Sequence, residues 1–356
     1  MTGVLLVGPL PPPVGGVATH VRELQRALET RGVGVTAIDP RRQGPDGTDG
    51  RPRLLHRLVM AAVRGELVHV HTNGHNRNSW MLAALGSVSH TLERATVLTL
   101  HSGLAPAFMR AHAPLVRHVA ARYSFVVAVS EEIAAALLAA GLSSERVMIV
   151  PAFSPASLDF RLAPPGLAEV RRRHAVLLAA TVIPEAVEYG ADVLLDAFVQ
   201  VRNRLPGAGL LIYGPGTRAP AFAHEVMRRG LKDSVHLFGP LARERALAVV
   251  AACDLFVRPT RADGDAISVR EALALGRPVV ASAVGTRPPE AITFTAGDAA
   301  ECAEKIFHIV GNGGPRASLK SAFGPDCIPA LLAIYRRCGL AVDDVTTGTP
   351  LAMSPV

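Results

Sequence analysis

Two acidic residues, Asp263 and Glu271, stand eight positions apart in the stretch PTRADGDAISVREALALGRPVVAS, which begins at Pro259. Gly264 and Ala266 lie between them, and small residues leave backbone amides open to a ligand. Carboxylates accept hydrogen bonds from hydroxyl groups, and a sugar offers several hydroxyls. The stretch is therefore typical either of a site for an anionic, sugar-bearing ligand or of a polar loop that precedes an ordinary helix.

Glu271 also fits a purely structural role at the start of a helix. Ser268 and Glu271 have the S-x-x-E spacing of a capping box, in which the serine caps the helix and the glutamate bonds back to the N-cap amide. This interpretation predicts a helix from Ser268 to about Leu275 and needs no ligand. Asp263, Gly264 and Ala266, which lie just upstream, favour a ligand-binding role instead.

A second candidate loop is GPLPPPVGGVATHVREL, which joins the first expected strand to the first expected helix. Gly15 and Gly16 directly precede the helix, where backbone N–H groups and the positive end of the helix dipole can approach a phosphate. A flexible loop without a ligand is the alternative. The G-x-G-x-x-G fingerprint of dinucleotide-binding folds is absent, so a nicotinamide-dependent dehydrogenase is the weakest functional candidate.

Histidines mark a third region. His101 ends the apolar run TVLTLH, where a histidine on its own is more often a hydrogen-bonded structural residue. His69, His71 and His75 follow one another in VHVHTNGH, and strand alternation places His69 and His71 on the same face. No acidic residue stands nearby to complete a ligand set, so we expect no metal there.

Strands and helices must position these loops, and short apolar runs do alternate with helical patterns along most of the chain. Such alternation is typical of βαβ units and parallel sheets. The expected strands are residues 3–8, 33–38, 67–71, 96–101, 125–130, 146–151, 175–181, 209–214, 235–239, 254–260 and 277–282.

The alternation forms two blocks, separated by a segment rich in Pro and Ser. The sequence therefore predicts an α/β fold with two tandem, Rossmann-like, doubly wound domains that face a cleft. The predicted parts are an N-terminal domain over 1–155, a linker over 156–168, a C-terminal domain over 169–325, a C-terminal helix over 326–341 and a disordered tail over 342–356. Because open parallel sheets bind ligands beyond the carboxyl ends of their strands, a site is expected in the loops after strands.

Composition excludes several classes of protein. Hydrophobic residues make up 49% and charged residues 19% of the chain, which favours a globular protein over a disordered one. The net charge of +7 favours anionic partners, but aromatics are only 4% and none is interleaved with the arginines, so nucleic acid is not an expected partner. No leader or membrane-spanning run is recognisable and the four cysteines are widely separated, which predicts a cytoplasmic protein with reduced thiols.

Residues 41–64 form an Arg-rich stretch. A solvated basic face is the favoured interpretation. The alternative is peripheral contact with the anionic inner face of a membrane, or with a lipid-linked acceptor.

These motifs together resemble a known family. The stretch from Pro259 is similar to the signature of the retaining GT-B glycosyltransferases of family four, in which two acidic residues flank seven others. GGVATHVREL is similar to the family's N-terminal glycine loop, VLTLHSG to its histidine loop, VVAVSEEIAAALLAAGL to the strand and helix before its linker, and HLFGPL to its base-contacting turn. The resemblance extends over nearly the whole chain. IVPAFSP, EYGAD, ADGDAISVREAL and RPPE together resemble a bacterial subgroup found with surface-polysaccharide or glycoconjugate assembly.

The resemblance implies that the first domain binds the acceptor and the second binds a nucleoside diphosphate sugar, a co-substrate that needs no cofactor and no metal. His101 and Asp263 are the implied catalytic residues, His101 beside the transferred sugar and Asp263, where the family usually has Glu, on its hydroxyls. The implied donor-binding residues are Gly15 and Gly16 near the diphosphate, Ala266, Ile267 and Ser268 at the helix start, Glu271 on the ribose and Leu241 beside the base.

One departure from the family concerns positive charge. The family places an Arg and a Lys after the first strand of the second domain, and this sequence has Thr181 and Tyr189 at those positions. Preorganised cations stabilise a departing diphosphate. Either Arg258, Arg261 or Arg270 compensates from the neighbouring loop, or the protein is a poor catalyst.

The predicted reaction is transfer of a sugar from a nucleoside diphosphate sugar to a hydroxyl acceptor, with retention at the anomeric carbon. The expected acceptor is either lipid-linked or a small glycoside. Two alternatives share the fold: a catalytically weakened binding or scaffold protein, and a sugar-nucleotide epimerase. The epimerase would convert the nucleotide sugar with no acceptor present.

Overall fold

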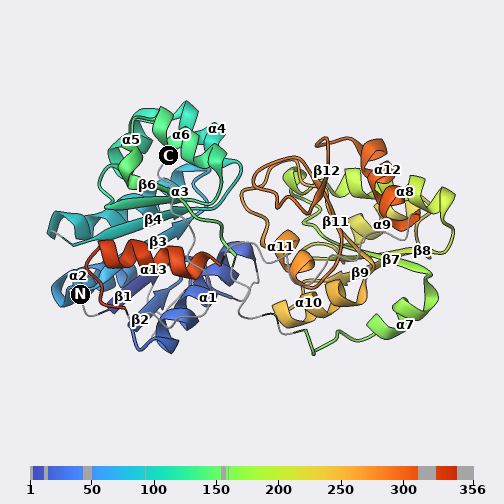
Figure 1. Cartoon of the computed structure of the whole chain (residues 1–356), viewed down its shortest axis with the longest axis horizontal. Helices are drawn as coiled ribbons and strands as arrows, with labels where there is room; N and C mark the ends of the chain where they lie inside the picture. Colours follow the sequence, from blue (N-terminus) through green and yellow to red (C-terminus); the bar gives the residue numbers. More distant parts are fainter. Residues whose placement is uncertain are drawn as a thin grey trace. The chain divides into compact units, whose positions relative to one another are not determined.

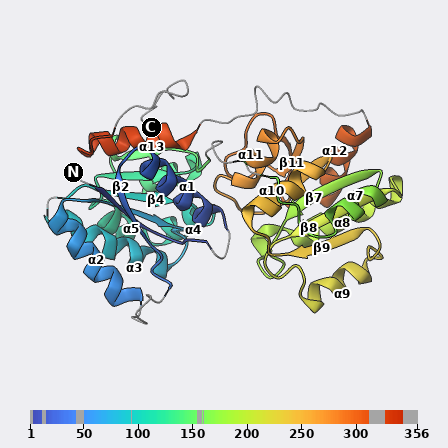
Figure 2. The same ribbon diagram turned by 90° about the horizontal axis from the view of Figure 1, so that it is seen from below.

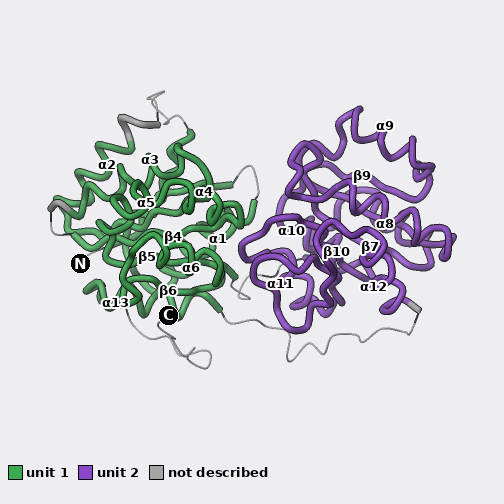
Figure 3. Tube along the Cα trace, turned by 90° about the horizontal axis from the view of Figure 1, so that it is seen from above, with its two compact units in different colours: residues 1–154, 325–356 green, residues 155–324 purple. Residues whose placement is uncertain are grey.

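The computed structural model of the chain describes residues 3–11, 15–42, 50–92, 94–153, 158, 160–311 and 326–342. The chain divides into two compact units: Met1–Ser154 with Pro325–Val356 is unit 1, and Pro155–Gly324 is unit 2 (Figure 3). Each unit contains a six-stranded, entirely parallel sheet, so the expected α/β class with two doubly wound domains is confirmed. Among the helices within these ranges, none is both long enough and apolar enough to cross a membrane.

The sheet of unit 1 has the strand order β2-β1-β3-β4-β5-β6. Its strands are β1 (Gly3–Val7), β2 (Gly34–Ile38), β3 (Leu67–Thr72), β4 (Thr96–Leu100), β5 (Phe125–Ala128) and β6 (Val147–Ile149). Its helices are α1 (Gly16–Thr30), α2 (Gly50–Arg64), α3 (Arg77–Gly86), α4 (Ala105–Ala111), α5 (Ala113–Ala120), α6 (Glu131–Ala139) and α13 (Cys327–Arg337), with 3-10 turns at Ser87–Leu92 and Ser144–Arg146 (Figures 1 and 2).

Helices α1 and α13 share one hydrophobic core with the sheet of unit 1. In α1, Val21, Leu24 and Leu28 recur on one face and are completely buried. They pack in a cluster with strand residues and with Leu331 and Tyr335 of α13. The C-terminal helix expected over 326–341 therefore forms as α13 and completes the core of the first unit, although unit 2 lies between them in the chain. The expected tail lies outside the described residues from position 343 onward.

The sheet of unit 2 has the strand order β12-β11-β10-β7-β8-β9. Its strands are β7 (Val176–Thr181), β8 (Ala208–Tyr213), β9 (Val235–Gly239), β10 (Leu255–Arg258), β11 (Val279–Ser282) and β12 (Ile292–Phe294). Its helices are α7 (Leu167–Arg173), α8 (Ala191–Arg204), α9 (Pro220–Arg228), α10 (Arg243–Ala252), α11 (Ile267–Ala274) and α12 (Ala299–Gly311), with a 3-10 turn at Val187–Tyr189. The sequence did not predict β12.

Both faces of this second sheet are buried. Alternate residues of β7 belong to two different cores: Leu178 packs with α8, α9 and α12, whereas Leu177 packs with α7, α10 and α11. A strand whose two faces are both covered becomes a continuous apolar run, which explains why VLLAAT carries no polar alternation.

Each sheet has one place where the strand order reverses direction. In unit 2 the order matches that of a nucleotide-binding doubly wound sheet, and the reversal lies between β7 and β10. In unit 1 the reversal lies between β1 and β3. Ligands of open parallel sheets bind at such switch points, beyond the carboxyl ends of the strands. These two places are therefore where a site is expected in each unit.

Candidate functional site

The switch point of unit 2 brings together the two loops that the sequence singled out in its second half. Strands β7 and β10 are paired in parallel, with Val257 opposite Ala180. Arg258, the last residue of β10, therefore lies beside Thr181, the last residue of β7, and its Nη1 donates to the Thr181 carbonyl oxygen at 3.4 Å.

Arg258 occupies the region where the two cations of the related family are missing. Its side chain is only 10% exposed, and its guanidinium carbon lies 5.1 Å from the centre of the Tyr189 ring. Its Nε donates to Oδ2 of Asp263 at 3.0 Å. One guanidinium group thus contacts Thr181, Tyr189 and the proposed catalytic carboxylate.

A second guanidinium group, which the sequence analysis missed, reaches the same carboxylate. Nη2 of Arg287 lies 3.2 Å from Oδ2 of Asp263 and 3.1 Å from Oγ1 of Thr260, and its Nε donates to the Ser282 carbonyl oxygen at 3.0 Å. Burial raises the pKa of Asp263, but the charges of Arg258 and Arg287 more than offset this, so its net pKa is lowered. The result is an ionised aspartate held between two cations.

The other two candidate cations make different pairs. Both terminal nitrogens of Arg261 bond the carboxylate of Asp192 on α8, at 2.7 and 2.6 Å. Arg270 lies inside α11 and donates to Oδ1 of Asp265 at 2.7 Å, with both side chains almost fully buried. Of the three arginines predicted from the sequence, Arg258 is the one that the structure brings to Asp263.

Close backbone contacts fix the loop that carries Asp263. Gly190 precedes α8 with φ +65°, and a Cβ added there would lie 2.0 Å from the Pro259 carbonyl oxygen. Gly285 has φ +62°, and a Cβ there would lie 2.3 Å from the carbonyl oxygens of Asp263 and Gly264. Because glycine is needed at both contacts, the loops after β7, β10 and β11 are packed directly against one another.

Helix α11 begins before Ser268, so the predicted capping box is wrong. Ala266 is the N-cap and Ile267 is the first helical residue, which places Ser268 inside the first turn. The side chain that precedes the cap, Asp265, is already bonded to Arg270. The first N–H groups of a helix have no partner within it, so the backbone near Ala266 and Ile267 is a suitable anion contact.

Glu271 lies on α11 beside the loop that follows β9. Its Oε1 accepts from Nε of Arg243 at 2.8 Å, and the two side chains are 13% and 14% exposed. Arg243 starts α10, two residues after Leu241. This ion pair replaces the capping box as the structural alternative for Glu271, and it links the proposed ribose-binding acid to the turn proposed to contact the base.

The glycine pair of unit 1 stands at the start of α1. Gly15 is the N-cap and Gly16 the first helical residue, and both are exposed. Among the residues that the structure describes, no atom would lie within 4 Å of a Cβ added at Gly15. The described residues therefore leave space beside the first amides of α1, where the phosphate interpretation places its ligand.

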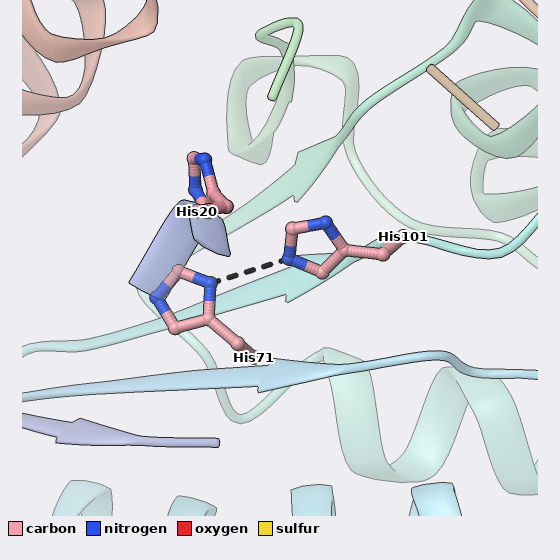
Figure 4. A group of neighbouring side chains, drawn as sticks. All are labelled: His20, His71 and His101. Atoms are coloured by element: carbon pink, nitrogen blue, oxygen red, sulfur yellow. Dashed lines mark hydrogen bonds between the residues drawn. The ribbon is translucent and has the colours of Figure 1, made fainter. Parts of the chain in front are cut away.

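Histidines gather at the switch point of the first sheet. His71 lies at the end of β3 and His101 directly after β4, and Nδ1 of His71 lies 3.3 Å from Nε2 of His101. His20 of α1, which the sequence analysis did not single out, joins them (Figure 4). It lies within the glycine-loop motif GGVATHVREL, so its position in that motif was the available signal.

His69 lies next to this group but is bonded on both sides, to Tyr335 at 2.6 Å and Thr99 at 2.7 Å. Its ring centre is 4.0 Å from that of His71, as expected for two residues on one face of a strand. Burial lowers the pKa of His20 to about 4 and holds the pKa values of His69, His71 and His101 well below their usual range. The four rings are therefore neutral at pH 7.

Family models match both halves of the chain. A model described as Glycosyltransferase Family 4 matches residues 14–153, and a model described as Glycosyl transferases group 1 matches residues 174–315. Together they include every strand of the two sheets except β1.

Known proteins resemble the chain in sequence and in fold. A GDP-mannose-dependent alpha-(1-6)-phosphatidylinositol monomannoside mannosyltransferase of Mycobacterium tuberculosis is 30% identical over 142 residues, which are 36% of this chain and 36% of that protein. The crystal structure of Anabaena HepE with UDP and glucose has a TM-score of 0.70 at 18% identity, covering 95% of this chain and all of that one. A putative UDP-N-acetylglucosamine 2-epimerase of Listeria monocytogenes has a TM-score of 0.65 at 14% identity, covering 94% and 96%.

Proposed function

Because the chain belongs to the GT-B glycosyltransferases of group 1 and family 4, we propose that it transfers a sugar from a nucleoside diphosphate sugar to a hydroxyl acceptor, with retention at the anomeric carbon. The observation that carries this proposal is the arrangement of Asp263 between Arg258 and Arg287 at the switch point of the second sheet. The mannosyltransferase relative uses a GDP sugar by its name, and HepE binds UDP, which supports a donor of this class.

In the proposed complex, unit 2 binds the donor. Glu271 accepts hydrogen bonds from the ribose hydroxyls, and the backbone of Leu241 contacts the base. The amides near Ala266 and Ile267 and the guanidinium of Arg258 stabilise the diphosphate, because preorganised donors act where negative charge develops. Arg258 would thus supply charge that Thr181 and Tyr189 lack.

Asp263 is proposed to hold the hydroxyls of the transferred sugar. A carboxylate kept ionised by two cations is an acceptor only, which suits hydroxyl donors. The same cations reduce its nucleophilicity, so we assign it a binding and orienting role. In the proposed retaining reaction the leaving phosphate takes the proton of the acceptor hydroxyl on the same face of the sugar, and no enzyme nucleophile is required.

In this proposal unit 1 binds the acceptor and also contacts the donor. His101, neutral through burial, would hydrogen-bond the transferred sugar, and Gly15 and Gly16 would let the diphosphate approach the N-terminus of α1. No metal takes part in the proposed transfer, because backbone amides, the helix dipole and guanidinium groups supply the positive charge.

Helix α2 offers a surface for peripheral membrane contact. Leu55, Val59 and Val63 are 49%, 47% and 70% exposed, and their i, i+4, i+8 spacing puts them on one face. Arg64 ends the same helix and is also exposed. Of the Arg-rich stretch 41–64, residues 43–49 lie outside the described part. We propose that this face binds anionic lipid at the cytoplasmic side of the membrane, where a lipid-linked acceptor of polysaccharide or glycoconjugate assembly would be reached.

Vesicle flotation tests the membrane contact. The chain is expected to float with anionic vesicles at low salt, and Val59→Glu should reduce the bound fraction while leaving nucleotide binding unchanged. Leu115→Glu, a change at an exposed apolar residue on α5, is the matched control. Equal flotation of the wild type and Val59→Glu would contradict the assignment of this face.

The transfer reaction itself is tested with donors and acceptors supplied separately. Nucleoside diphosphate release should require both a donor such as UDP-glucose or GDP-mannose and a hydroxyl acceptor, and NMR of the product should show the anomeric configuration of the donor. Conversion of the nucleotide sugar without an acceptor would identify an epimerase, the alternative favoured by the shared fold. Binding without any turnover would identify a scaffold protein.

A further inference from the structure

Three histidines from separate segments of unit 1 converge on one point. His20 comes from α1, His71 from the end of β3 and His101 from the loop after β4 (Figure 4). One ring nitrogen of each can be chosen so that all three lie within 4.8 Å of one another. The proposed transfer reaction uses His101 alone, so the convergence of the other two rings has no role in it.

The ring positions fit a shared metal ion. The ring centres are 5.3 Å apart for His20 and His71, 5.2 Å for His20 and His101, and 5.5 Å for His71 and His101. With metal–nitrogen distances of about 2.0–2.1 Å, three imidazoles on a tetrahedral ion have centres roughly 5.2 Å apart and nitrogens roughly 3.3 Å apart. The ring centres therefore already lie close to the spacing that a shared ion requires.

Two buried nitrogens in the cluster lack a hydrogen bond. Nε2 of His20 and Nε2 of His71 have no partner among the described residues, although the two residues are 3% and 0% exposed. Buried polar atoms are normally hydrogen-bonded, so two unpaired nitrogens in one group of rings call for an explanation. Both belong to histidines of the converging group.

The surroundings of His20 prepare it as a ligand. Its Nδ1 lies 3.2 Å from the Ala152 carbonyl oxygen, to which it donates in the tautomer that leaves Nε2 with a lone pair. A histidine that binds a metal usually donates its other ring N–H to a carbonyl or carboxylate in this way. His69 differs, because Tyr335 and Thr99 engage both of its nitrogens.

We propose that His20, His71 and His101 form a site for a transition-metal ion of the Zn²⁺ class, with a fourth position left open. Imidazole nitrogen is a favoured ligand of Zn²⁺ and Co²⁺, and three histidines with an open position are an established zinc donor set. The ion would replace the contact between His71 and His101. It takes no part in sugar transfer.

This site has a consequence that rests on the proposed function. His101 is also the residue proposed to contact the donor sugar, so an ion bound through it would compete with the donor. Zn²⁺ is therefore expected to act as an inhibitor that raises the apparent dissociation constant of the donor.

Cobalt binding tests the site without relying on activity. The full-length chain without an affinity tag, freed of metal with a chelator, is titrated with Co²⁺ and followed by visible absorption and calorimetry. One equivalent should bind with the absorption of a four-coordinate ion, and Zn²⁺ should displace it. His20→Gln and His71→Gln should each weaken binding by about tenfold or more, with folding checked by circular dichroism.

Two control variants separate this site from other histidines. His69→Gln changes a neighbouring buried ring that is not a ligand, and His174→Gln removes one member of the His174–His236 pair in unit 2. Neither should change Co²⁺ affinity. Absence of stoichiometric Co²⁺ binding, or binding that survives His20→Gln and is lost in His174→Gln, would overturn the proposal.

Donor titration with and without Zn²⁺ separates this inference from the function on which it rests. If the chain binds Co²⁺ but no nucleotide sugar, the metal-site proposal is supported and the proposed competition with the donor is wrong. If the chain turns over a nucleotide sugar but binds no Co²⁺, the metal-site proposal is wrong and the proposed function is supported.

Discussion

Replacement of Arg258 tests whether this side chain stabilises the donor diphosphate where Thr181 and Tyr189 replace two cations. In the wild type, the guanidinium contacts Asp263, Thr181 and Tyr189 and is nearly buried. A charge-assisted hydrogen bond to phosphate contributes about 1.5–3 kcal/mol. Arg258→Ala should therefore weaken binding of the nucleoside diphosphate by about 10- to 150-fold.

Comparison of two ligands isolates the phosphate contribution. In calorimetry, Arg258→Ala should bind the preferred nucleoside diphosphate more weakly than the wild type does but should bind the parent nucleoside equally well, because Arg258 is not proposed to contact ribose or base. Arg258→Lys keeps the charge but not the planar contact with Tyr189, so an intermediate affinity is expected.

Arg204 provides a matched control for this substitution. It too pairs with a carboxylate, Glu304 at 2.7 Å, and lies over an aromatic ring, Phe307 at 4.4 Å, but it is 58% exposed at the end of α8. Arg204→Ala should leave both affinities unchanged. Asp263 keeps Arg287 as a partner in Arg258→Ala, so the variant should fold. A folded Arg258→Ala that binds the diphosphate within twofold of the wild type would refute the reasoning.

Three further substitutions probe the same unit. Glu271→Gln should weaken binding of the nucleoside itself about tenfold, through the lost charge-assisted bonds to ribose; unchanged calorimetric affinity would contradict the proposed ribose contact. Gly190→Ala places a Cβ 2.0 Å from the Pro259 carbonyl oxygen and should lower the free energy of unfolding by about 1–3 kcal/mol more than Gly230→Ala does, because Gly230 also has positive φ but its added Cβ would meet no atom of the described residues within 4 Å; equal losses in chemical denaturation would contradict the close contact. The pKa of Asp263 lies below its ordinary 3.8 in the folded chain, so its contribution to the free energy of unfolding is complete above pH 3.8 and is lost as pH falls through the folded pKa. In this acidic range the free energy of unfolding of Asp263→Asn should fall less steeply with decreasing pH than that of the wild type. Parallel curves would contradict stabilisation of the Asp263 carboxylate by the two cations.

Much of the fold could be predicted because each strand lies in a sheet covered by helices. Buried parallel strands leave continuous apolar runs that are visible in one sequence, as VLLAAT does. Strand β12 has three residues, of which Phe294 alone is fully buried, so it leaves no comparable run. The helical pattern of α13 was equally clear, but which sheet it packs against depends on contacts across about 180 intervening residues and not on local pattern.

The candidate site was predictable where loops follow strands and unpredictable where side chains cross between loops. Arg258 ends β10 and Asp263 lies in the loop that follows it, whereas Arg287 reaches the same carboxylate from the loop after β11. The predicted capping box was wrong because spacing alone does not show where the helix begins. Helix α11 begins at Ile267, and the side chain of Asp265, just before the N-cap, is bonded to Arg270. A pairing distant in sequence decided the first case, and the local backbone conformation decided the second.

Calorimetric titration with a panel of nucleoside diphosphate sugars is the most direct test of the central claim, that the second switch point binds such a donor. The wild type should bind one member of the panel with a stoichiometry of one. The double variant Asp263→Asn and Glu271→Gln should bind it about 100-fold more weakly, since each carboxylate is expected to contribute at least one charge-assisted bond. A wild type that binds no member of the panel, or a folded double variant that binds as tightly as the wild type, would contradict the account.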